Sequence, residues 1–154
     1  MFRIVLIEPE IPQNTGNIAR LCAATGIDLV LVGKLGFSID DKHLKRAAMD
    51  YWEQVNVTHI KTIDEYFETL QNNIYAISTK GHTLYTEINV TPDVMSDIIF
   101  GSEGAGLPKF MYEKYSDKLY RIPMKNDLRS LNLSSAASIV SYHLLSKMNF
   151  PDLF

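Results

Sequence analysis

Short apolar runs alternate along the chain with segments in which apolar residues recur at helical spacing. Runs rich in β-branched residues are typical of buried strands, and an apolar stripe with a period near 3.6 is typical of a helix packed on a core. The apolar runs predict strands over residues 3–7, 29–32, 55–60, 74–79, 98–101 and 119–124. The periodic segments predict helices over residues 15–25, 40–50, 62–71, 108–115 and 132–148.

Local signals support the ends of several of these helices. Gly26 follows the first periodic segment, as a helix-terminating glycine does. Thr62 and Glu65 have the spacing of a capping box, and Pro108 suits a first helical turn because its missing N–H costs nothing there. Since nearly continuous apolar strands alternate with helices, we expect one α/β domain over residues 1–154, a mainly parallel sheet with helices on both faces.

Composition excludes several classes of protein. With 154 residues, 46% of them hydrophobic and 21% charged, the chain has the profile of one globular domain and not of a disordered one. No apolar run approaches the length of a membrane span, and the first residues do not have the pattern of a signal peptide. The single cysteine, Cys22, and four scattered histidines show no metal-ligand spacing. We therefore expect a cytoplasmic, metal-free protein.

The charge is unevenly distributed, although its net value is only −3. The stretch from Lys109 to Arg129 has six basic and three acidic residues, so it is net positive on an otherwise acidic chain. A local basic surface is compatible with an anionic partner that docks at one place. An ordinary solvated helix and loop explain the same charges.

The loop after the first predicted strand joins two prolines to a run of polar residues. Asn14, Thr15 or Asn17 could cap the following helix, and a helix N-terminus with free N–H groups can bind an anion. Arg20, about one turn further on, could reach the same anion. A capped helix with an arginine in solvent is an equally good interpretation.

Two further polar loops follow later predicted strands, where ligands of parallel α/β sheets bind. Glycines at 101, 104 and 106 let a backbone approach a ligand closely, but neither a P-loop nor a dinucleotide fingerprint is present. An uncharged ring such as adenine or ribose fits this loop better than a phosphate, and a tight loop without a ligand remains the alternative. In the last loop, Ser130 or Asn132 could simply be an N-cap.

Three motifs nevertheless occur in a fixed order: Asn14-x-Gly16-x-x-x-Arg20, then Gly101-x-Glu103-x-x-Gly106-Leu107-Pro108, then Ile122-Pro123-Met124 with Ser130-Leu131-Asn132-Leu133-Ser134. Together they resemble the SPOUT class of RNA 2′-O-ribose methyltransferases. The chain looks most like the minimal TrmL (YibK) type, which modifies the wobble nucleotide, a cytidine or modified uridine, in tRNAs such as leucine tRNAs. The similarity covers essentially the whole chain.

The resemblance implies a trefoil knot near the C-terminus, an exception to the rule that chains do not thread loops. It also implies that the knot loops bind S-adenosyl-L-methionine and release S-adenosyl-L-homocysteine. The cofactor-binding residues that it implies are Ile77, Gly101, Glu103, Ile122, Met124, Ser130 and Leu131.

The same resemblance implies a homodimer that packs through its last helix and shares its active site, with Arg20 reaching the partner's cofactor. Because a guanidinium stays protonated, we expect Arg20 to hold the target phosphate and stabilise the developing alkoxide, and not to act as a base. Asn132 is the second expected catalytic residue and orients the ribose. Candidate contacts to tRNA are Asn14, Lys80, Lys125, Arg129 and Tyr142.

Three other functions remain open at this point: methylation of ribosomal RNA, RNA binding without catalysis, and a flavodoxin-like or dinucleotide-binding role. The presence of Arg20, Glu103, Ser130 and Asn132 favours an enzyme over a non-catalytic relative. The missing phosphate fingerprints argue against the flavodoxin-like and dinucleotide-binding alternatives.

Overall fold

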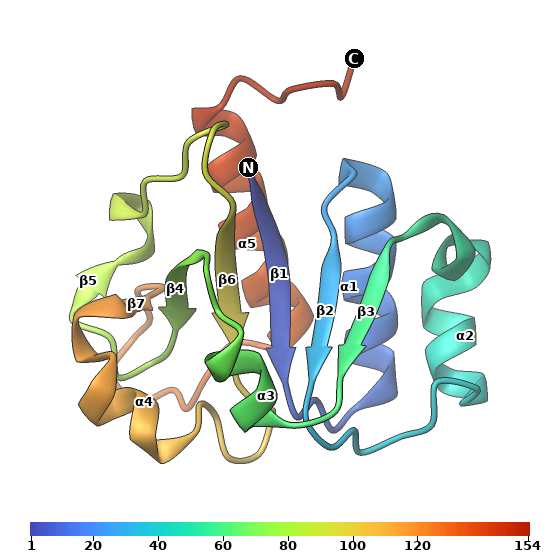
Figure 1. Ribbon diagram of the computed structural model, residues 1–154, viewed down its shortest axis with the longest axis horizontal. Helices are drawn as coiled ribbons and strands as arrows, with labels where there is room; N and C mark the ends of the chain where they lie inside the picture. Colours follow the sequence, from blue (N-terminus) through green and yellow to red (C-terminus); the bar gives the residue numbers. More distant parts are fainter.

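A computed structural model describes residues 1–154 and contains one seven-stranded sheet in the order β3-β2-β1-β6-β4-β7-β5 (Figure 1). Its strands are β1 (Phe2–Ile7), β2 (Leu29–Val32), β3 (Val57–Ile60), β4 (Asn73–Ile77), β5 (Thr83–Leu84), β6 (Ser96–Phe100) and β7 (Leu119–Arg121). Every neighbouring pair is parallel. The carboxyl ends of all strands therefore lie at one edge of the sheet.

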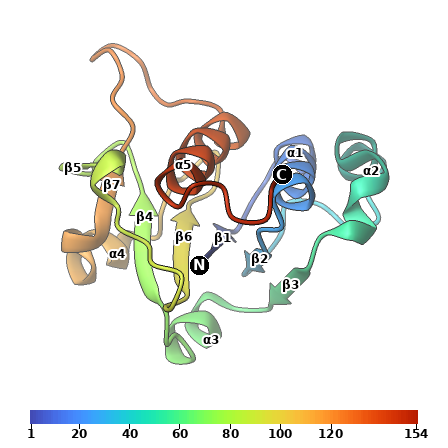
Figure 2. The same ribbon diagram turned by 90° about the horizontal axis from the view of Figure 1, so that it is seen from above.

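Helices cover both faces of this sheet (Figure 2). They are α1 (Pro12–Thr25), α2 (Lys42–Ala48), α3 (Ile63–Glu68), α4 (Lys109–Lys114) and α5 (Leu133–Lys147). Alternate residues of β1 point to opposite cores: Ile4 and Leu6 pack with α1 and α5, whereas Val5 and Ile7 pack with α3 and α4. The predicted parallel α/β arrangement with two helical layers is thus confirmed.

The predicted elements exist, but several bounds differ for local reasons. The last strand ends at Arg121 and not at residue 124, and Pro123, which cannot donate to a ladder, follows it. Helix α2 ends at Ala48, where Met49 takes a positive φ of 52° and a 3₁₀ turn over Met49–Gln54 begins. Pro108 is the N-cap of α4 and not part of its first turn. The two-residue strand β5 was too short for a sequence pattern to indicate.

Two of the predicted helix ends are confirmed. Gly26 ends α1 with a left-handed φ of 69°. The Thr62 hydroxyl accepts a hydrogen bond of 3.1 Å from the backbone N–H of Glu65 and so caps α3. Gly26 and the Thr62 hydroxyl act as the sequence predicts, because each depends only on its immediate chain neighbours. The return hydrogen bond of a full capping box, from the Thr62 N–H to the Glu65 carboxylate, is not formed.

A buried carboxylate on β6 joins three elements beneath the α3 face. Asp97 is fully buried and accepts hydrogen bonds from the Arg3 guanidinium (2.7 and 3.1 Å), the Tyr66 hydroxyl (2.6 Å) and the Asn72 amide (2.8 Å). The hydrogen bond to Asp97 raises the pKa of Arg3. Burial, with the adjacent negative charge of Asp97, raises the pKa of Tyr66. Both side chains therefore keep their protons while they bind the carboxylate.

Cys22 lies on α1 within the larger core. Burial raises the pKa of its thiol to about 12. At neutral pH the thiol is therefore protonated and unreactive.

None of the helices combines the length and the apolarity that crossing a membrane requires.

Candidate active site

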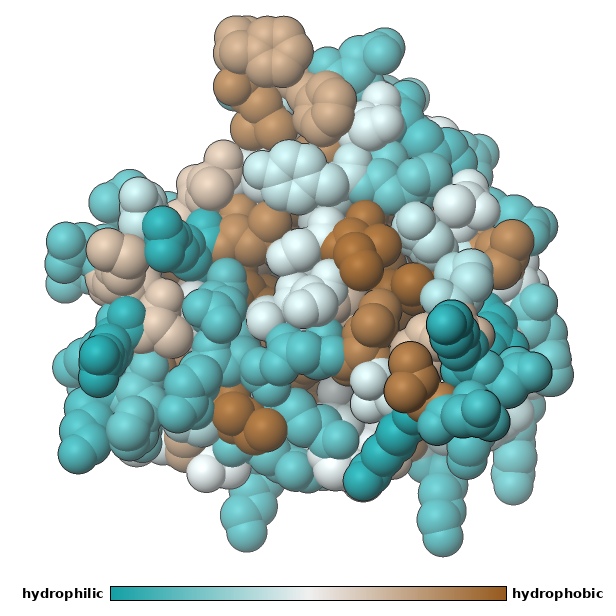
Figure 3. Space-filling view, turned by 180° about the vertical axis from the view of Figure 1, so that it is seen from behind, coloured by the Kyte–Doolittle hydropathy of each residue, from teal (hydrophilic) through white to brown (hydrophobic).

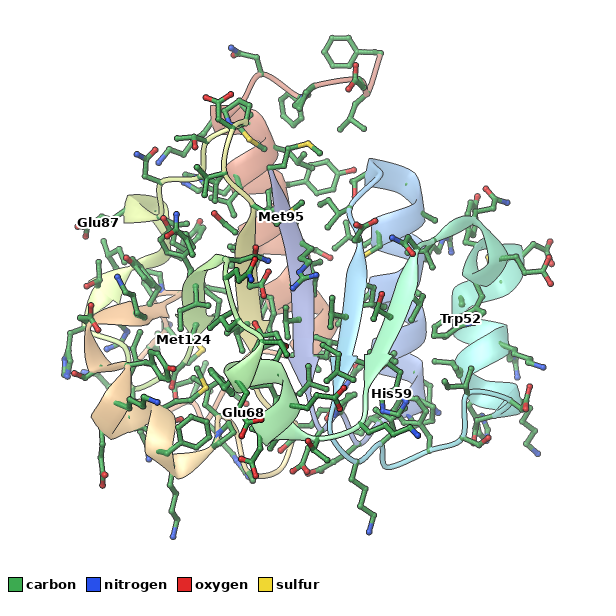
Figure 4. The ribbon with its side chains drawn as sticks, in the orientation of Figure 1. Trp52, His59, Glu68, Glu87, Met95 and Met124 are labelled. Atoms are coloured by element: carbon green, nitrogen blue, oxygen red, sulfur yellow. The ribbon has the colours of Figure 1, made fainter.

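A cavity of about 500 Å³ opens beyond the carboxyl ends of β6, β4 and β7, which are neighbours in the sheet. Its walls come from the loops that follow these strands, from α4 and from the starts of α1 and α5. Figure 4 shows one of the lining residues, Met124, beside β4 and α4, in the half of the molecule away from Trp52 and His59, which lie near the β3 edge of the sheet. This volume is typical of sites for small molecules and cofactors.

The loop after β6 forms one wall of the cavity from its backbone. Ser102 and Gly106 exchange two backbone hydrogen bonds of 3.1 and 2.9 Å, which folds the loop back on itself. A Cβ atom on Gly101 would lie 2.1 Å from the carbonyl carbon of Gly106, and Gly106 has a φ of 75°. Both positions therefore require glycine for the fold of the loop itself, and the close approach of this backbone to a ligand stays a prediction.

The first motif is built differently from the prediction, because α1 begins earlier, with Pro12 in its first turn. Ile11 is the N-cap and provides no side-chain hydrogen bond, so the prediction that Asn14, Thr15 or Asn17 caps this helix is wrong. Gly16 serves helix packing, since a Cβ there would lie 2.6 Å from that of Ala47.

The carboxylate of Glu103, on the loop after β6, takes the place of the missing cap. It accepts hydrogen bonds from the backbone N–H groups of Glu10 (2.7 Å) and Ile11 (3.1 Å) and from the side-chain amide of Asn14 (3.1 Å). The anion at the start of α1 is therefore part of the chain itself. Arg20 makes no ion pair with Glu103, and its binding of an anionic ligand stays a prediction.

Asn14 and Asn132 complete a connection between all three motifs. The Asn132 amide donates a hydrogen bond of 2.9 Å to the side-chain oxygen of Asn14. Asn14 is buried, with 5% of its surface exposed. The oxygen of Asn132 accepts from the backbone N–H groups of Ser134 (2.9 Å) and Ser135 (3.4 Å), so Asn132 is also the N-cap of α5. One chain of polar contacts thus holds the three loops together at the cavity.

We expect a Glu103→Gln substitution to lower the free energy of unfolding by about 1–2 kcal/mol, because an amide replaces a carboxylate that accepts three hydrogen bonds. Chemical denaturation measures the change. Glu113→Gln, on the exposed side of α4, is the matched control and should alter stability by less than about 0.5 kcal/mol. Equal effects of the two substitutions would contradict a capping role for Glu103.

All seven predicted cofactor-binding positions line the cavity: Ile77, Gly101, Glu103, Ile122, Met124, Ser130 and Leu131. Asn132 lines it too, as do three candidate RNA contacts, Asn14, Lys80 and Arg129. The sequence patterns did not indicate Ser78 or Tyr112, which also line the cavity. Tyr112 lies in a short helix where an aromatic residue is expected for packing alone.

Three predicted residues lie outside the cavity: Arg20, Lys125 and Tyr142. Arg20 is exposed on α1, with its guanidinium carbon 5.5 Å from the centre of the Tyr51 ring. Lys125 is exposed in the loop after β7. Tyr142 is 48% exposed and borders a separate apolar hollow that includes Phe150. Within one chain, the structure does not bring these three side chains to the cavity.

The charged side chains of the cavity lining are Lys80, Glu103 and Arg129. Glu103 is engaged by the first loop, and the guanidinium of Arg129 donates a hydrogen bond of 3.2 Å to the carbonyl of Gly104. Apolar side chains and backbone form much of the remaining wall. No group of three or more His, Cys, Asp or Glu residues is arranged to hold a metal ion.

Parallel α/β proteins bind their ligands beyond the carboxyl ends of the strands, in sites formed by the loops there. The cavity of this chain, with its glycine-rich loop, has the position of such a site, and it is the site and not the fold that determines function. The chain belongs to the SpoU rRNA Methylase family, which matches residues 1–142. A relative from Saccharophagus degradans, named tRNA (cytidine(34)-2′-O)-methyltransferase, is 43% identical over 153 residues that cover 97% of each chain.

Solved structures share the fold as well. One, described as "Structural insights into the 2-OH methylation of C/U34 on tRNA", has a TM-score of 0.87, is 34% identical and covers 97% of each chain. The SpoU methyltransferase AviRb from Streptomyces viridochromogenes, in complex with the cofactor AdoMet, has a TM-score of 0.83 at 19% identity. The match covers 97% of the present chain and 58% of AviRb, so the fold also occurs as part of longer proteins.

Proposed function

We propose that this chain transfers a methyl group from S-adenosyl-L-methionine to the ribose 2′-hydroxyl of nucleotide 34 of tRNA, a cytidine or a modified uridine. The observation that carries the proposal is the single cavity at which Asn14, Glu103 and Asn132 join the three motifs. The names of the relatives at 43% and 34% identity support the same substrate. Leucine tRNAs are the proposed substrates within that class, and a tRNA substrate implies a cytoplasmic location.

The cavity suits the adenosyl part of this cofactor. Its volume of about 500 Å³ accommodates a nucleoside, and the glycine-rich loop that lines it offers backbone groups to a flat ring. Ile77, Ile122 and Leu131 provide apolar contacts around it. When bound, the cofactor supplies a methyl group on a positively charged sulfur. The protein therefore has to supply position and electrostatics more than chemical reactivity.

Asn132 and Arg20 are the two residues proposed to act on the RNA substrate. Asn132 is held by Asn14 and by the start of α5, so its side chain is fixed before the ribose arrives, where it orients the sugar. Arg20 binds the target phosphate and stabilises the oxygen that becomes negatively charged as its proton leaves. Because Arg20 lies outside the cavity of its own chain, we infer that it acts in the active site of a partner subunit.

A homodimer that packs through α5 and α1 would bring Arg20 to the partner's cavity. Figure 3 shows apolar side chains gathered on the face that carries these helices. Ile139 and Tyr142 are exposed on α5 (38% and 48%), and Phe154 at the chain end is fully exposed. Exposed apolar groups of this kind are typical of surfaces that bind another protein. Burial of Tyr142 in this interface is an alternative to its proposed contact with tRNA.

We also propose that the chain is knotted near its C-terminus. Strand β7 lies between β4 and β5, and the chain then crosses to α5, which packs beside α1 on the same face of the sheet (Figure 2). The connection consists of residues 122–132, of which Ile122, Met124 and residues 129–132 also line the cavity. Exposed basic residues on this connection, Lys125 and Arg129, are the proposed contacts to tRNA, with Asn14 at the cavity itself.

The test uses the full chain with cofactor labelled on its methyl group and an unmodified leucine tRNA transcript. We expect label in the tRNA, on the ribose of nucleotide 34. A transcript that already carries a 2′-O-methyl group at nucleotide 34 is the matched control and should accept none. A parallel reaction contains ribosomal RNA in place of the tRNA, and label there alone would assign a different substrate. Binding of S-adenosyl-L-homocysteine without transfer to any RNA would indicate a non-catalytic relative.

A further inference from the structure

A second group of polar side chains lines the cavity apart from the Asn14–Glu103–Asn132 contacts. The hydroxyl groups of Ser78 and Tyr112 lie 3.2 Å apart, and the backbone N–H of Lys80 donates a hydrogen bond of 3.1 Å to the Ser78 hydroxyl. The Lys80 ammonium lies 4.9 Å from the centre of the Tyr112 ring, within the range of a cation–π interaction. We call Ser78, Lys80 and Tyr112 the lysine corner of the cavity.

The backbone holds the lysine corner in place. The N–H of Ser78 donates to the carbonyl of Tyr120 on β7 (2.8 Å), and the N–H of Gly81 donates back to the carbonyl of Ser78 (3.1 Å). Gly81 is buried so closely against β7 that a Cβ there would lie 2.6 Å from the carbonyl carbon of Tyr120. The backbone of Lys80 therefore lies in a fixed turn, so the backbone does not have to be ordered when the side chain binds a ligand.

Lys80 is the cation of the cavity that has no polar partner. Arg129 donates to the carbonyl of Gly104, and the carboxylate of Glu103 is taken by the first loop. The Lys80 ammonium makes no salt bridge and no hydrogen bond. When the Ser78 hydroxyl donates to Tyr112, the Tyr112 proton is free to point into the cavity beside the ammonium. The lysine corner thus offers one positive charge and one hydroxyl donor to an anion.

We propose that the lysine corner binds the carboxylate of the amino-acid part of S-adenosyl-L-methionine. This inference rests on the proposed function. The adenosyl part of the ligand fits the neutral wall, and its methyl group has to face the ribose held near Asn132, which leaves the carboxylate as the part that needs a positive charge. A carboxylate pairs well with an ammonium and a phenol hydroxyl together. Lys80 then contacts the cofactor, and its place among the candidate RNA contacts is given up.

The experiment measures the dissociation constants of two ligands by calorimetry. S-adenosyl-L-homocysteine carries the amino-acid part, whereas 5′-methylthioadenosine has the same adenosine and sulfur without it. We expect Lys80→Met to weaken the binding of S-adenosyl-L-homocysteine about tenfold, the loss of one charge-assisted contact. Binding of 5′-methylthioadenosine should change less than about twofold. Tyr112→Phe, which keeps the ring beneath the ammonium, should show the same selectivity with a smaller effect.

Lys114→Met is the matched control, because Lys114 lies 5.5 Å from the ring centre of Tyr115 but outside the cavity. It should leave the binding of both ligands unchanged. If Lys80→Met weakens both ligands equally, or weakens tRNA binding while S-adenosyl-L-homocysteine binds as before, the inference is wrong and Lys80 returns to the RNA contacts. If the unaltered protein binds neither ligand, the proposed cofactor itself is wrong.

Discussion

An Arg20→Lys substitution is expected to reduce the rate of methyl transfer to tRNA at least about a hundredfold, while S-adenosyl-L-homocysteine binds with unchanged affinity. Lysine keeps the positive charge and can still lie over Tyr51, where the guanidinium carbon is 5.5 Å from the ring centre. It loses the planar fork that holds a phosphate through two parallel hydrogen bonds. Single-turnover kinetics with saturating cofactor measure the rate, and calorimetry measures the affinity.

The two measurements separate catalysis from cofactor binding because Arg20 is absent from the lining of its own cavity. It is exposed on α1, and its removal exposes no unpaired buried group, so the fold should be unaffected. Arg46→Lys, on the exposed surface of α2, is the matched control for a loss of guanidinium geometry. Parent turnover by the Arg20→Lys protein would contradict the role proposed for Arg20.

Mixed dimers test whether Arg20 acts across the subunit interface. A second variant, Met124→Trp, fills the cavity and should bind no cofactor, but it keeps Arg20. Neither variant alone should methylate tRNA. In a mixture, a dimer with one subunit of each kind has one site with an intact cavity and an intact arginine, so about a quarter of the parent activity should return. No recovery after confirmed subunit exchange would show that Arg20 acts within its own chain.

The sequence alone was sufficient to predict the parallel sheet and its two helical layers, because burial on both faces makes the strands continuously apolar. In β1 and β6 nearly every residue is buried, and the helical stripe of α5 is buried at Ala137, Val140 and Leu144. The end of α1 at Gly26 and the start of α3 at Thr62 could also be predicted, because each depends only on neighbouring residues. The cofactor positions followed from the family resemblance and not from the pattern of residues.

What the sequence could not predict depends on contacts between distant residues. Glu103 caps α1 from 93 positions away, so a search among Asn14, Thr15 and Asn17 was bound to miss it. Tyr112 likewise reaches Ser78 from a separate helix, 34 positions along the chain. In both cases a polar side chain is placed by the topology of the sheet, which brings the loops after β1, β4 and β6 to one edge.

Asp97→Ala is expected to lower the free energy of unfolding by about 3 kcal/mol, since it leaves the Arg3 guanidinium without its counterion. The Tyr66 hydroxyl and the Asn72 amide lose their partner as well. The Arg3 side chain is 28% exposed and can recover some hydration, which places the loss at the lower end of the range for buried pairs. Urea titrations of the two proteins at neutral pH measure the difference.

Asp40→Ala is the matched control, because Asp40 pairs with Lys45 at 3.2 Å but is 89% exposed, and it should cost less than about 1 kcal/mol. A similar cost for the two substitutions would show that burial of Asp97 contributes nothing.

The dependence of stability on pH in the alkaline range adds a second test. The pKa of Tyr66 is raised in the folded protein, so its contribution to stability is complete below about pH 10, where the unfolded chain begins to lose the proton, and declines as the pH rises further. Tyr66→Phe should remove that part of the decline, because phenylalanine has no proton to lose in either state.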